Sequence, residues 1–93
     1  MLKFEWDEAK NRLNVRRHGV DFADVTDFLD DPGVIERLDL RDDYGEERIM
    51  AIANVGGRIM AILYVERGSA IRLISARTAS RDETNDYFRI NAL

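Results

Sequence analysis

Four arginines in the second half of the sequence are candidates for chemistry on a phosphodiester. They are Arg48, Arg67, Arg72 and Arg77. Several guanidinium groups could hold a phosphate and stabilise the extra negative charge of its transition state, and Glu47 and Glu66 stand directly beside two of them. The same arginines could instead be solvated charges that keep the edges of a sheet from pairing with other chains. Residue types alone leave both interpretations open.

A second group of basic side chains precedes Gly19. His18, the only histidine, follows Arg16 and Arg17, and Lys10 lies eight residues earlier. Histidine exchanges protons readily near neutral pH, so His18 could act as a general acid or base, or it could contact a phosphate. Alternatively, His18 is a cation that stabilises the carbonyl end of a helix. Its position fits either role.

Thiol, metal and cofactor chemistry have little support in the composition. The sequence has no cysteine and one histidine, which excludes thiolate catalysis and multi-histidine metal sites. Eleven carboxylates fall within residues 21–47, but no Asp-x-Asp-x-Asp-Gly loop for Ca²⁺ occurs among them. We therefore expect no metal ion and no cofactor. The acidic segment is interpreted as a solvated surface or as a dock for a basic partner.

The net charge of −4 hides an uneven distribution of charge. Residues 1–20 have a formal charge of +2, residues 21–47 of −9, and residues 48–93 of +3. Twelve of the fourteen basic residues are arginine, the side chain that binds phosphate and carboxylate through paired donors. The two positive segments are therefore compatible with a nucleic-acid partner.

The chain should form one small domain that spans residues 1–93. Its hydrophobic content of 45% is enough for a single core, and no repeat or linker divides it. No apolar stretch approaches the roughly 20 residues that span a bilayer, and the N-terminal residues lack the apolar region of a signal peptide. We expect a cytoplasmic protein without a membrane partner.

The first half of the sequence predicts a strand and two helices. Alternating apolar residues over 2–6 indicate a short strand. Residues 7–19 predict a helix with Asp7 as its N-cap and a glycine at its C-terminal end. A second helix is expected over residues 21–31, before Pro32-Gly33. Its buried stripe would consist of Phe22, Val25, Phe28 and Leu29.

The second half predicts a sheet and a closing helix. Strands are expected over residues 34–40, 48–55, 58–65 and 70–77. A polar loop over 41–45 separates the first two, and Gly56-Gly57 suits a two-residue hairpin turn, since glycine tolerates positive φ. Ser80 should cap a short C-terminal helix, with Glu83 completing a capping box. The order β-α-α-β-β-β-β-α predicts an α+β fold with an antiparallel sheet, two N-terminal helices and a short C-terminal helix.

The hairpin turns predict which strand residues lie opposite one another. A turn at Gly56-Gly57 places Arg48 opposite Val65, and a following loop of even length places Val65 opposite Arg72. These residues then share one face, toward which Arg67 also projects. The other face should carry Tyr64, Glu66, Ser75 and Arg77. A loop of odd length would reverse the faces of the last strand.

Apolar side chains occur on both predicted faces of the sheet. Two helices can cover one face, whereas the short C-terminal helix covers only part of the other. An uncovered apolar patch usually marks a site for a partner. Whether another chain seals part of the sheet is left open by these patterns.

An ordered set of residues resembles the BrnT toxins of type II toxin–antitoxin systems. Its N-terminal part is Phe4-Glu5-Trp6-Asp7, Lys10, Asn14, His18-Gly19-Val20 and Phe22. The remainder is Gly45-Glu46-Glu47-Arg48, Glu66-Arg67-Gly68, Arg72-Leu73-Ile74-Ser75-Ala76-Arg77, Ala79 and Glu83. The resemblance spans about residues 3–83, in the order typical of the family.

The resemblance implies a RelE-like fold and a metal-independent endoribonuclease that inhibits translation by cleaving RNA. It also implies a cognate BrnA-like antitoxin with a ribbon-helix-helix DNA-binding domain. The two proteins would form a complex, typically a heterotetramer, that represses its own operon. The toxin would then meet operator DNA only through the antitoxin.

The resemblance further suggests roles for individual residues. Arg67, Arg72 and Arg77 would contact the phosphate and its transition state. Glu66 is a candidate base or orients an arginine, and His18 is a candidate for proton transfer. Glu47 and Arg48 are expected to form a structural pair. RNA contacts are expected from Lys10, Arg16, Arg17, Arg48 and Arg81.

The sequence departs from the family pattern after Arg77. The family usually continues with a dense basic run, whereas residues 78–83 contain one arginine and two acidic residues. Fewer phosphate contacts weaken binding to RNA, because each contact releases counterions. The alternative function is therefore an attenuated or non-catalytic partner of a ribbon-helix-helix antitoxin, acting in operon autoregulation.

Overall fold

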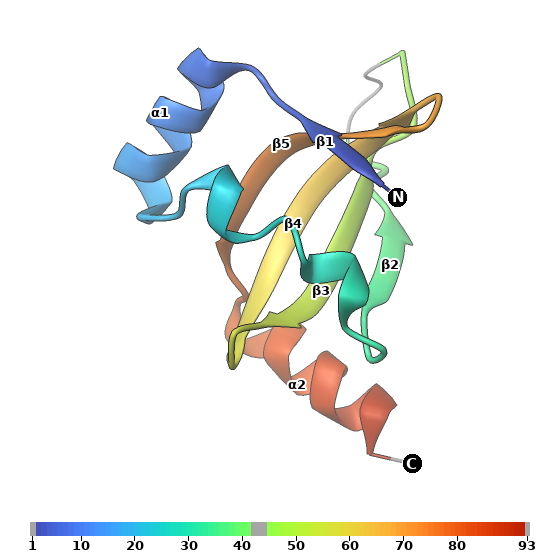
Figure 1. Ribbon diagram of the computed structural model, residues 1–93. Coiled ribbons are helices and arrows are strands. Elements are labelled where there is room, and N and C mark those ends of the chain that lie inside the picture. The colour runs from blue at the N-terminus through green and yellow to red at the C-terminus, as the bar shows by residue number, and fades with distance from the viewer. Residues whose placement is uncertain (1, 42–44, 93) are drawn as a thin grey trace.

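The computed structural model describes residues 2–41 and 45–92 (Figure 1). The elements are β1 (Lys3–Glu5), α1 (Glu8–His18), η1 (Phe22–Asp24), η2 (Phe28–Asp30), β2 (Ile35–Leu38), β3 (Ile49–Val55), β4 (Arg58–Arg67), β5 (Ala70–Thr78) and α2 (Arg81–Asn91). Here η denotes a short 3₁₀ helix. The predicted polar loop over 41–45 lies partly outside the described residues, because residues 42–44 are not among them.

The five strands form one sheet in the order β1-β5-β4-β3-β2. Strands β2 to β5 are antiparallel neighbours, as predicted, and Gly56 and Gly57 have positive φ in the hairpin turn. The prediction of a wholly antiparallel sheet is wrong at one edge, where β1 runs parallel to β5. Most of the chain separates these two strands, so no hairpin turn constrains their relative direction. The fold is α+β with a mixed sheet.

The predicted second helix is also wrong in type, because the segment forms η1 and η2 instead of one α-helix. Phe22, Val25 and Phe28 are spaced by three residues and all three are buried. η1 and η2 are single turns of three residues each, and Val25 lies between them at φ −123°, so the chain does not keep the regular rotation of an α-helix across these positions. The stripe was therefore recognised correctly, but its period was misread.

One face of the sheet, here called the core face, packs under η1 and η2 (Figure 1). Phe22 and Phe28 are fully buried against alternate residues of the central strands, including Ile62 and Tyr64. The ring of Phe28 contacts Tyr64 at a centroid distance of 5.3 Å. The Tyr64 hydroxyl donates to a Glu36 oxygen at 2.9 Å, which satisfies its buried polar end.

Helix α2 lies at the end of the sheet near the β3–β4 turn, against the opposite face (Figure 1). Tyr87 packs on Ile52 and Ala61, and its hydroxyl donates to Asp31 at 2.7 Å. Gly33 permits this approach, since a Cβ there would lie 2.8 Å from the Tyr87 hydroxyl. Burial raises the pKa of Asp31, but hydrogen bonds from Asn54, Gly33 and Tyr87 outweigh it and lower that pKa overall. Asp31 is therefore a structural carboxylate.

Helix α1 begins and ends as predicted and lies beside β5 (Figure 1). Asp7 accepts a hydrogen bond from the Lys10 N–H, and Gly19 closes the helix at φ 70°. The buried residues of α1 are Asn11 and Asn14 rather than an apolar stripe. The Asn14 amide donates to the Ala76 carbonyl at 2.9 Å and accepts from the Ala76 N–H at 3.1 Å. Asn14 thus satisfies backbone groups at the edge of β5 that β1 does not reach.

Candidate functional site

A β-bulge in β5 decides which face the arginines occupy. The predicted pair Val65–Arg72 is present, and the turn at Gly56-Gly57 places Ile52 opposite Ala61. The register then shifts between Leu63 and Tyr64, so that Leu63 pairs with Ser75 and Ala61 with Arg77. Because β5 contains one extra residue at this point, Ser75 and Arg77 lie on the same face as Arg72. The prediction that Ser75 and Arg77 lie on the other face is wrong.

The face opposite the core face is here called the arginine face, after Arg48, Arg67, Arg72 and Arg77. Arg72 lies between Val65 of β4 and Glu5 of β1 in the strand register. Arg48 directly precedes β3, one residue beyond the Ile49–Tyr64 pair, and its carbonyl accepts a hydrogen bond from the Asp39 N–H at 2.7 Å. The paired residues Glu5, Arg72 and Val65 cross β1, β5 and β4, and the alternation of β3 directs Arg48 to the same face as Val65.

The sequence left open whether part of the sheet is an uncovered apolar patch, and the burial of two apolar residues on the arginine face bears on this question. Leu63 and Val65 belong to this face, yet both are buried within the single chain. Long arginine side chains stand next to them in the register, and their aliphatic stems can cover apolar neighbours. Among residues 2–41 and 45–92, the large exposed apolar side chains lie elsewhere. They are Leu2, Val15, Leu38, Leu40, Phe88 and Ile90.

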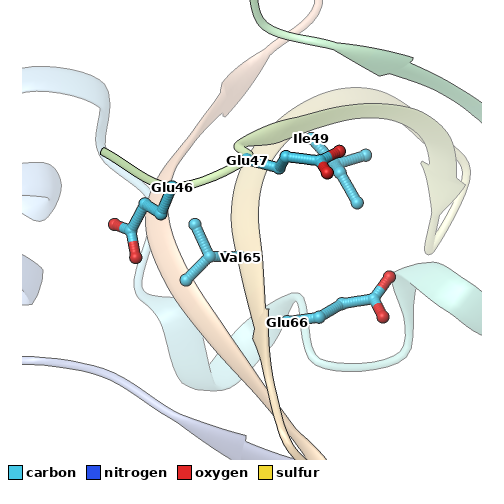
Figure 2. Close-up of a pocket in the computed structure, with 5 residues that line it drawn as sticks. All are labelled: Glu46, Glu47, Ile49, Val65 and Glu66. Atoms are coloured by element: carbon cyan, nitrogen blue, oxygen red, sulfur yellow. The ribbon is translucent and has the colours of Figure 1, made fainter. Parts of the chain in front are cut away.

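Each of these four arginines forms an ion pair with a carboxylate. Arg67 lies 3.3 Å from Glu46 and Arg72 lies 3.8 Å from Glu5. The Arg48 Nε atom lies 4.0 Å from Glu46, so the expected pairing of Arg48 with Glu47 is wrong. Glu46 thus pairs with both Arg48 and Arg67. Figure 2 shows that Glu47 points to the opposite side of the strands from Glu46.

Arg77 and Glu83 form the tightest of these pairs. The Arg77 Nη1 and Nη2 atoms lie 2.6 Å and 3.0 Å from the two carboxylate oxygens. This hydrogen bonding lowers the pKa of Glu83 to about 2 and raises the pKa of Arg77. Both side chains are charged at neutral pH, and the guanidinium is held in a defined orientation.

Asp39 and Arg41 also contribute to the arginine face, and the sequence patterns missed them. Asp39 accepts from Arg41 Nε and Nη2, both at 2.8 Å, and its side chain is only 4% exposed. These bonds lower the pKa of Asp39 to about 2. Arg41 is close enough to Arg77 to oppose the rise in its pKa. Asp39 falls in the strand that was predicted over residues 34–40 and Arg41 in the polar loop that follows it, so neither position indicated this contact, although an Asp-x-Arg spacing is compatible with it.

A groove of about 240 Å³ lies between α1 and β5, beside the bulge. Its wall on α1 includes Lys10, Arg17 and His18, and its wall on β5 includes Ile74 and Ser75. Ser75 belongs to the arginine face, so this α1 groove is continuous with that face. The structure therefore brings three of the predicted RNA-contacting or catalytic residues together.

Two predicted RNA contacts do not belong to this group. Arg16 lies on another side of α1, where it lines a separate cavity of about 530 Å³ with Val15 and Asp21. Arg81 is the exposed first residue of α2. Within residues 2–41 and 45–92, neither forms an ion pair.

Glu66 is separated from the arginines by the alternation of β4. It lines a groove of about 340 Å³ with Glu46, Glu47, Ile49 and Val65. Figure 2 shows Glu66 on the same side as Glu47 and Ile49, whereas Val65 and Glu46 project to the other side. Burial raises the pKa of Tyr64, and the nearby charges of Glu36 and Glu66 raise it further. The geometry thus connects Glu66 with Tyr64 rather than with Arg72 or Arg77.

Two further classes of site were sought in the part of the chain that the structure describes. It contains no group of three or more His, Cys, Asp or Glu side chains placed to hold a metal ion. No helix in that part is long and apolar enough to span a membrane.

Comparison with known proteins relates the chain to a described family. Residues 6–83 match the family model described as the ribonuclease toxin, BrnT, of type II toxin–antitoxin systems. No curated protein matches the chain. The match covers more than half of the 93 residues and includes all of the elements from α1 to β5.

Proposed function

Because the chain belongs to the BrnT family of ribonuclease toxins from type II toxin–antitoxin systems, we propose that the arginine face and the α1 groove form its RNA-cleaving site. The bulge in β5 is the observation that carries this proposal. It places Arg77 on the same face as Arg72 and brings Ser75 to the α1 groove. Cations from two separate elements thereby border one continuous surface.

The proposed reaction is attack of the RNA 2′-hydroxyl on the adjacent phosphorus atom, without a metal ion. A base removes the 2′-hydroxyl proton, an acid protonates the departing 5′-oxygen, and cations stabilise the negative charge on the phosphoryl oxygens. We assign the last role to Arg67, Arg72 and Arg77. Their ion pairs hold the guanidinium groups in place before the substrate arrives, so little reorganisation is needed during the reaction.

His18 is the proposed group for proton transfer, and Lys10 and Arg17 are proposed to position the RNA. All three line the α1 groove. Glu66 is the weaker candidate for the base, since it points away from Arg72 and Arg77. Arg48, Arg16 and Arg81 would at most add contacts along the RNA.

The type II family implies an antitoxin partner. We propose a BrnA-like protein with a ribbon-helix-helix domain, joined with the toxin in a heterotetramer that represses its operon. The formal charge of −9 on residues 21–47 supports binding to a basic protein of this kind. RNA cleavage by the free toxin would arrest translation.

An attenuated toxin is the second candidate function. The carboxylates Glu5, Glu46 and Glu83 already occupy donors of the arginines that would hold a phosphate. RNA phosphates would have to compete with these carboxylates for the guanidinium donors. The single arginine in residues 78–83 adds little further attraction for RNA. Such a chain would act mainly through its antitoxin.

Expression of the chain in a bacterial host, with and without the neighbouring antitoxin gene, tests the proposal. We expect growth arrest that the antitoxin relieves, together with cleavage of an RNA oligonucleotide by the purified chain in EDTA. Arg77→Ala should relieve the growth arrest and lower the cleavage rate by orders of magnitude, to a slow rate that can still be measured. Arg58→Ala is the matched control, because Arg58 occupies the core-face register of the same sheet. Harmless expression of the parent chain would favour the attenuated partner.

A further inference from the structure

Glu83 links the start of α2 to the arginine face. It is the third residue of the helix, where its Oε1 atom accepts the Ser80 N–H at 2.8 Å, completing the capping box. The same carboxylate accepts hydrogen bonds from both terminal nitrogens of Arg77. The capping box was expected from the sequence, whereas this second function of Glu83 was not.

The geometry of the pair determines which donors of Arg77 stay available. Nη1 donates to Glu83 and lies 3.4 Å from the Thr78 carbonyl, and Nη2 uses one hydrogen on Glu83. Nε and the second hydrogen of Nη2 lie on the same edge of the guanidinium and form no other bond within the described chain. Two parallel donors of this kind match two oxygens of a phosphate.

We propose that Glu83 is a positioning residue that holds Arg77 with its Nε–Nη2 edge directed to a phosphate group of the RNA. The Arg77 side chain is 32% exposed, so part of it is open to a phosphate group from solvent. The inference rests on the proposed function, because it assigns Glu83 a role through Arg77. It adds a residue of α2 to a site otherwise built from β4, β5 and α1.

A carboxylate is needed for this role but not for the helix cap. Glutamine at the same position would still accept the Ser80 N–H, since the capping box admits either residue. It would replace one oxygen by an amide nitrogen, which cannot accept from Arg77. Glu83→Gln therefore separates the orientation of Arg77 from the folding of α2.

Single-turnover cleavage of an RNA oligonucleotide by the full chain tests the inference. We expect Glu83→Gln to slow the chemical step about 10- to 100-fold, as misplacement of a reacting group by about 1 Å does, with little change in RNA affinity. Ser80→Ala is the matched control, because it removes the hydroxyl that accepts the Glu83 N–H and leaves the Arg77 pair intact. Its cleavage rate should equal that of the parent.

The double variant identifies how Glu83 acts. If Glu83 acts only through Arg77, adding Glu83→Gln to Arg77→Ala causes no further loss of rate. A further loss in the double variant would overturn the inference, and so would cleavage at the parental rate by Glu83→Gln while Arg77→Ala cleaves much more slowly than the parent. Parental cleavage by Arg77→Ala would instead overturn the proposed function itself.

Discussion

The two basic regions of the molecule differ in how their charges are held. On the arginine face, Arg67, Arg72 and Arg77 each have a carboxylate partner within 4 Å. On α1, no ion pair with the described chain forms at any basic side chain. The basic side chains of α1 are Lys10, Arg12, Arg16, Arg17 and His18.

This difference indicates that the two basic regions contribute to different steps, cleavage of RNA and binding of RNA. A paired guanidinium has a fixed orientation but a reduced net charge, which suits stabilisation of a transition state at short range. An unpaired cation keeps its full long-range attraction, which suits capture of a polyanion and depends strongly on salt. We therefore expect substitutions on the arginine face to change the rate of cleavage, and substitutions on α1 to change the affinity for RNA.

The largest effect is expected from Arg72→Ala. Arg72 lies on β5, opposite Val65 of β4 and Glu5 of β1. Its removal should lower kcat about 10²- to 10³-fold, as removal of a transition-state donor does. Steady-state cleavage of an RNA oligonucleotide measures this, with Arg17→Ala as the comparison. A larger loss of kcat in Arg17→Ala than in Arg72→Ala would contradict the division of tasks.

Asn14→Ala should loosen α1 from the sheet. The substitution leaves the buried N–H and carbonyl of Ala76 and the carbonyl of Val20 without their hydrogen-bond partner. Unsatisfied buried groups of this kind lower the free energy of unfolding by about 2 kcal/mol. Denaturant unfolding checks the value, and Arg12→Ala, on the exposed side of α1, should stay within about 0.5 kcal/mol of the parent. Equal stability of the two variants would show that Asn14 does not hold the groove together.

Removal of α1 cations should have a smaller effect, confined to binding. Lys10→Ala and Arg17→Ala each remove one phosphate contact, so the slope of log Kd against log salt should fall by about 0.7 per substitution on single-stranded RNA. Fluorescence anisotropy over a series of salt concentrations measures the slope. Arg16→Ala serves as the control, because Arg16 lines a different cavity. A slope that changes only with Arg16 would place the RNA on the other side of the helix.

The smallest effect concerns acid stability. The pKa of Glu83 is lowered to about 2 by Arg77, from an ordinary value near 4.5. Its contribution is therefore complete above about pH 5 and is lost as the pH falls toward 2, since the unfolded chain takes up the proton first. We expect the parent to lose about 1 kcal/mol more than Glu83→Gln between pH 6 and pH 3, because solvent screens part of the interaction. Thermal unfolding of both proteins at the two pH values measures this difference. Equal losses of stability in the parent and in Glu83→Gln would show that the ion pair contributes nothing.

The features that the sequence predicted correctly depend on neighbouring residues. Asp7, Gly19, Ser80 and Gly56-Gly57 act within a few positions of themselves, so their caps and turn could be predicted without knowledge of the core. The direction of β1 and the face of Arg77 depend on contacts between distant segments. They could not be obtained from alternation alone.

Arg77 nevertheless carried a sign of the bulge. Unbroken alternation from Leu73 would direct Ser75 and Arg77 into the aromatic core and expose Ala76. A guanidinium among Phe28, Tyr64 and their neighbours would be strongly unfavourable, because its charge would lack water. An arginine at a core position of a predicted strand thus indicates an extra residue before it. This one extra residue is why Arg77 lies on the face opposite to the one that regular alternation predicts.

Because of the bulge, the face on which Arg77 lies depends on the number of residues between Arg72 and Arg77. Loss of one residue at position 74 would restore regular pairing and transfer Arg77, with everything after it in β5, to the opposite side of the sheet. Substitutions in β5 that keep its length preserve the surface, whereas a single-codon deletion inverts it. The segment between Leu73 and Ala76 should therefore tolerate changes of side chain far better than changes of length during the evolution of this protein.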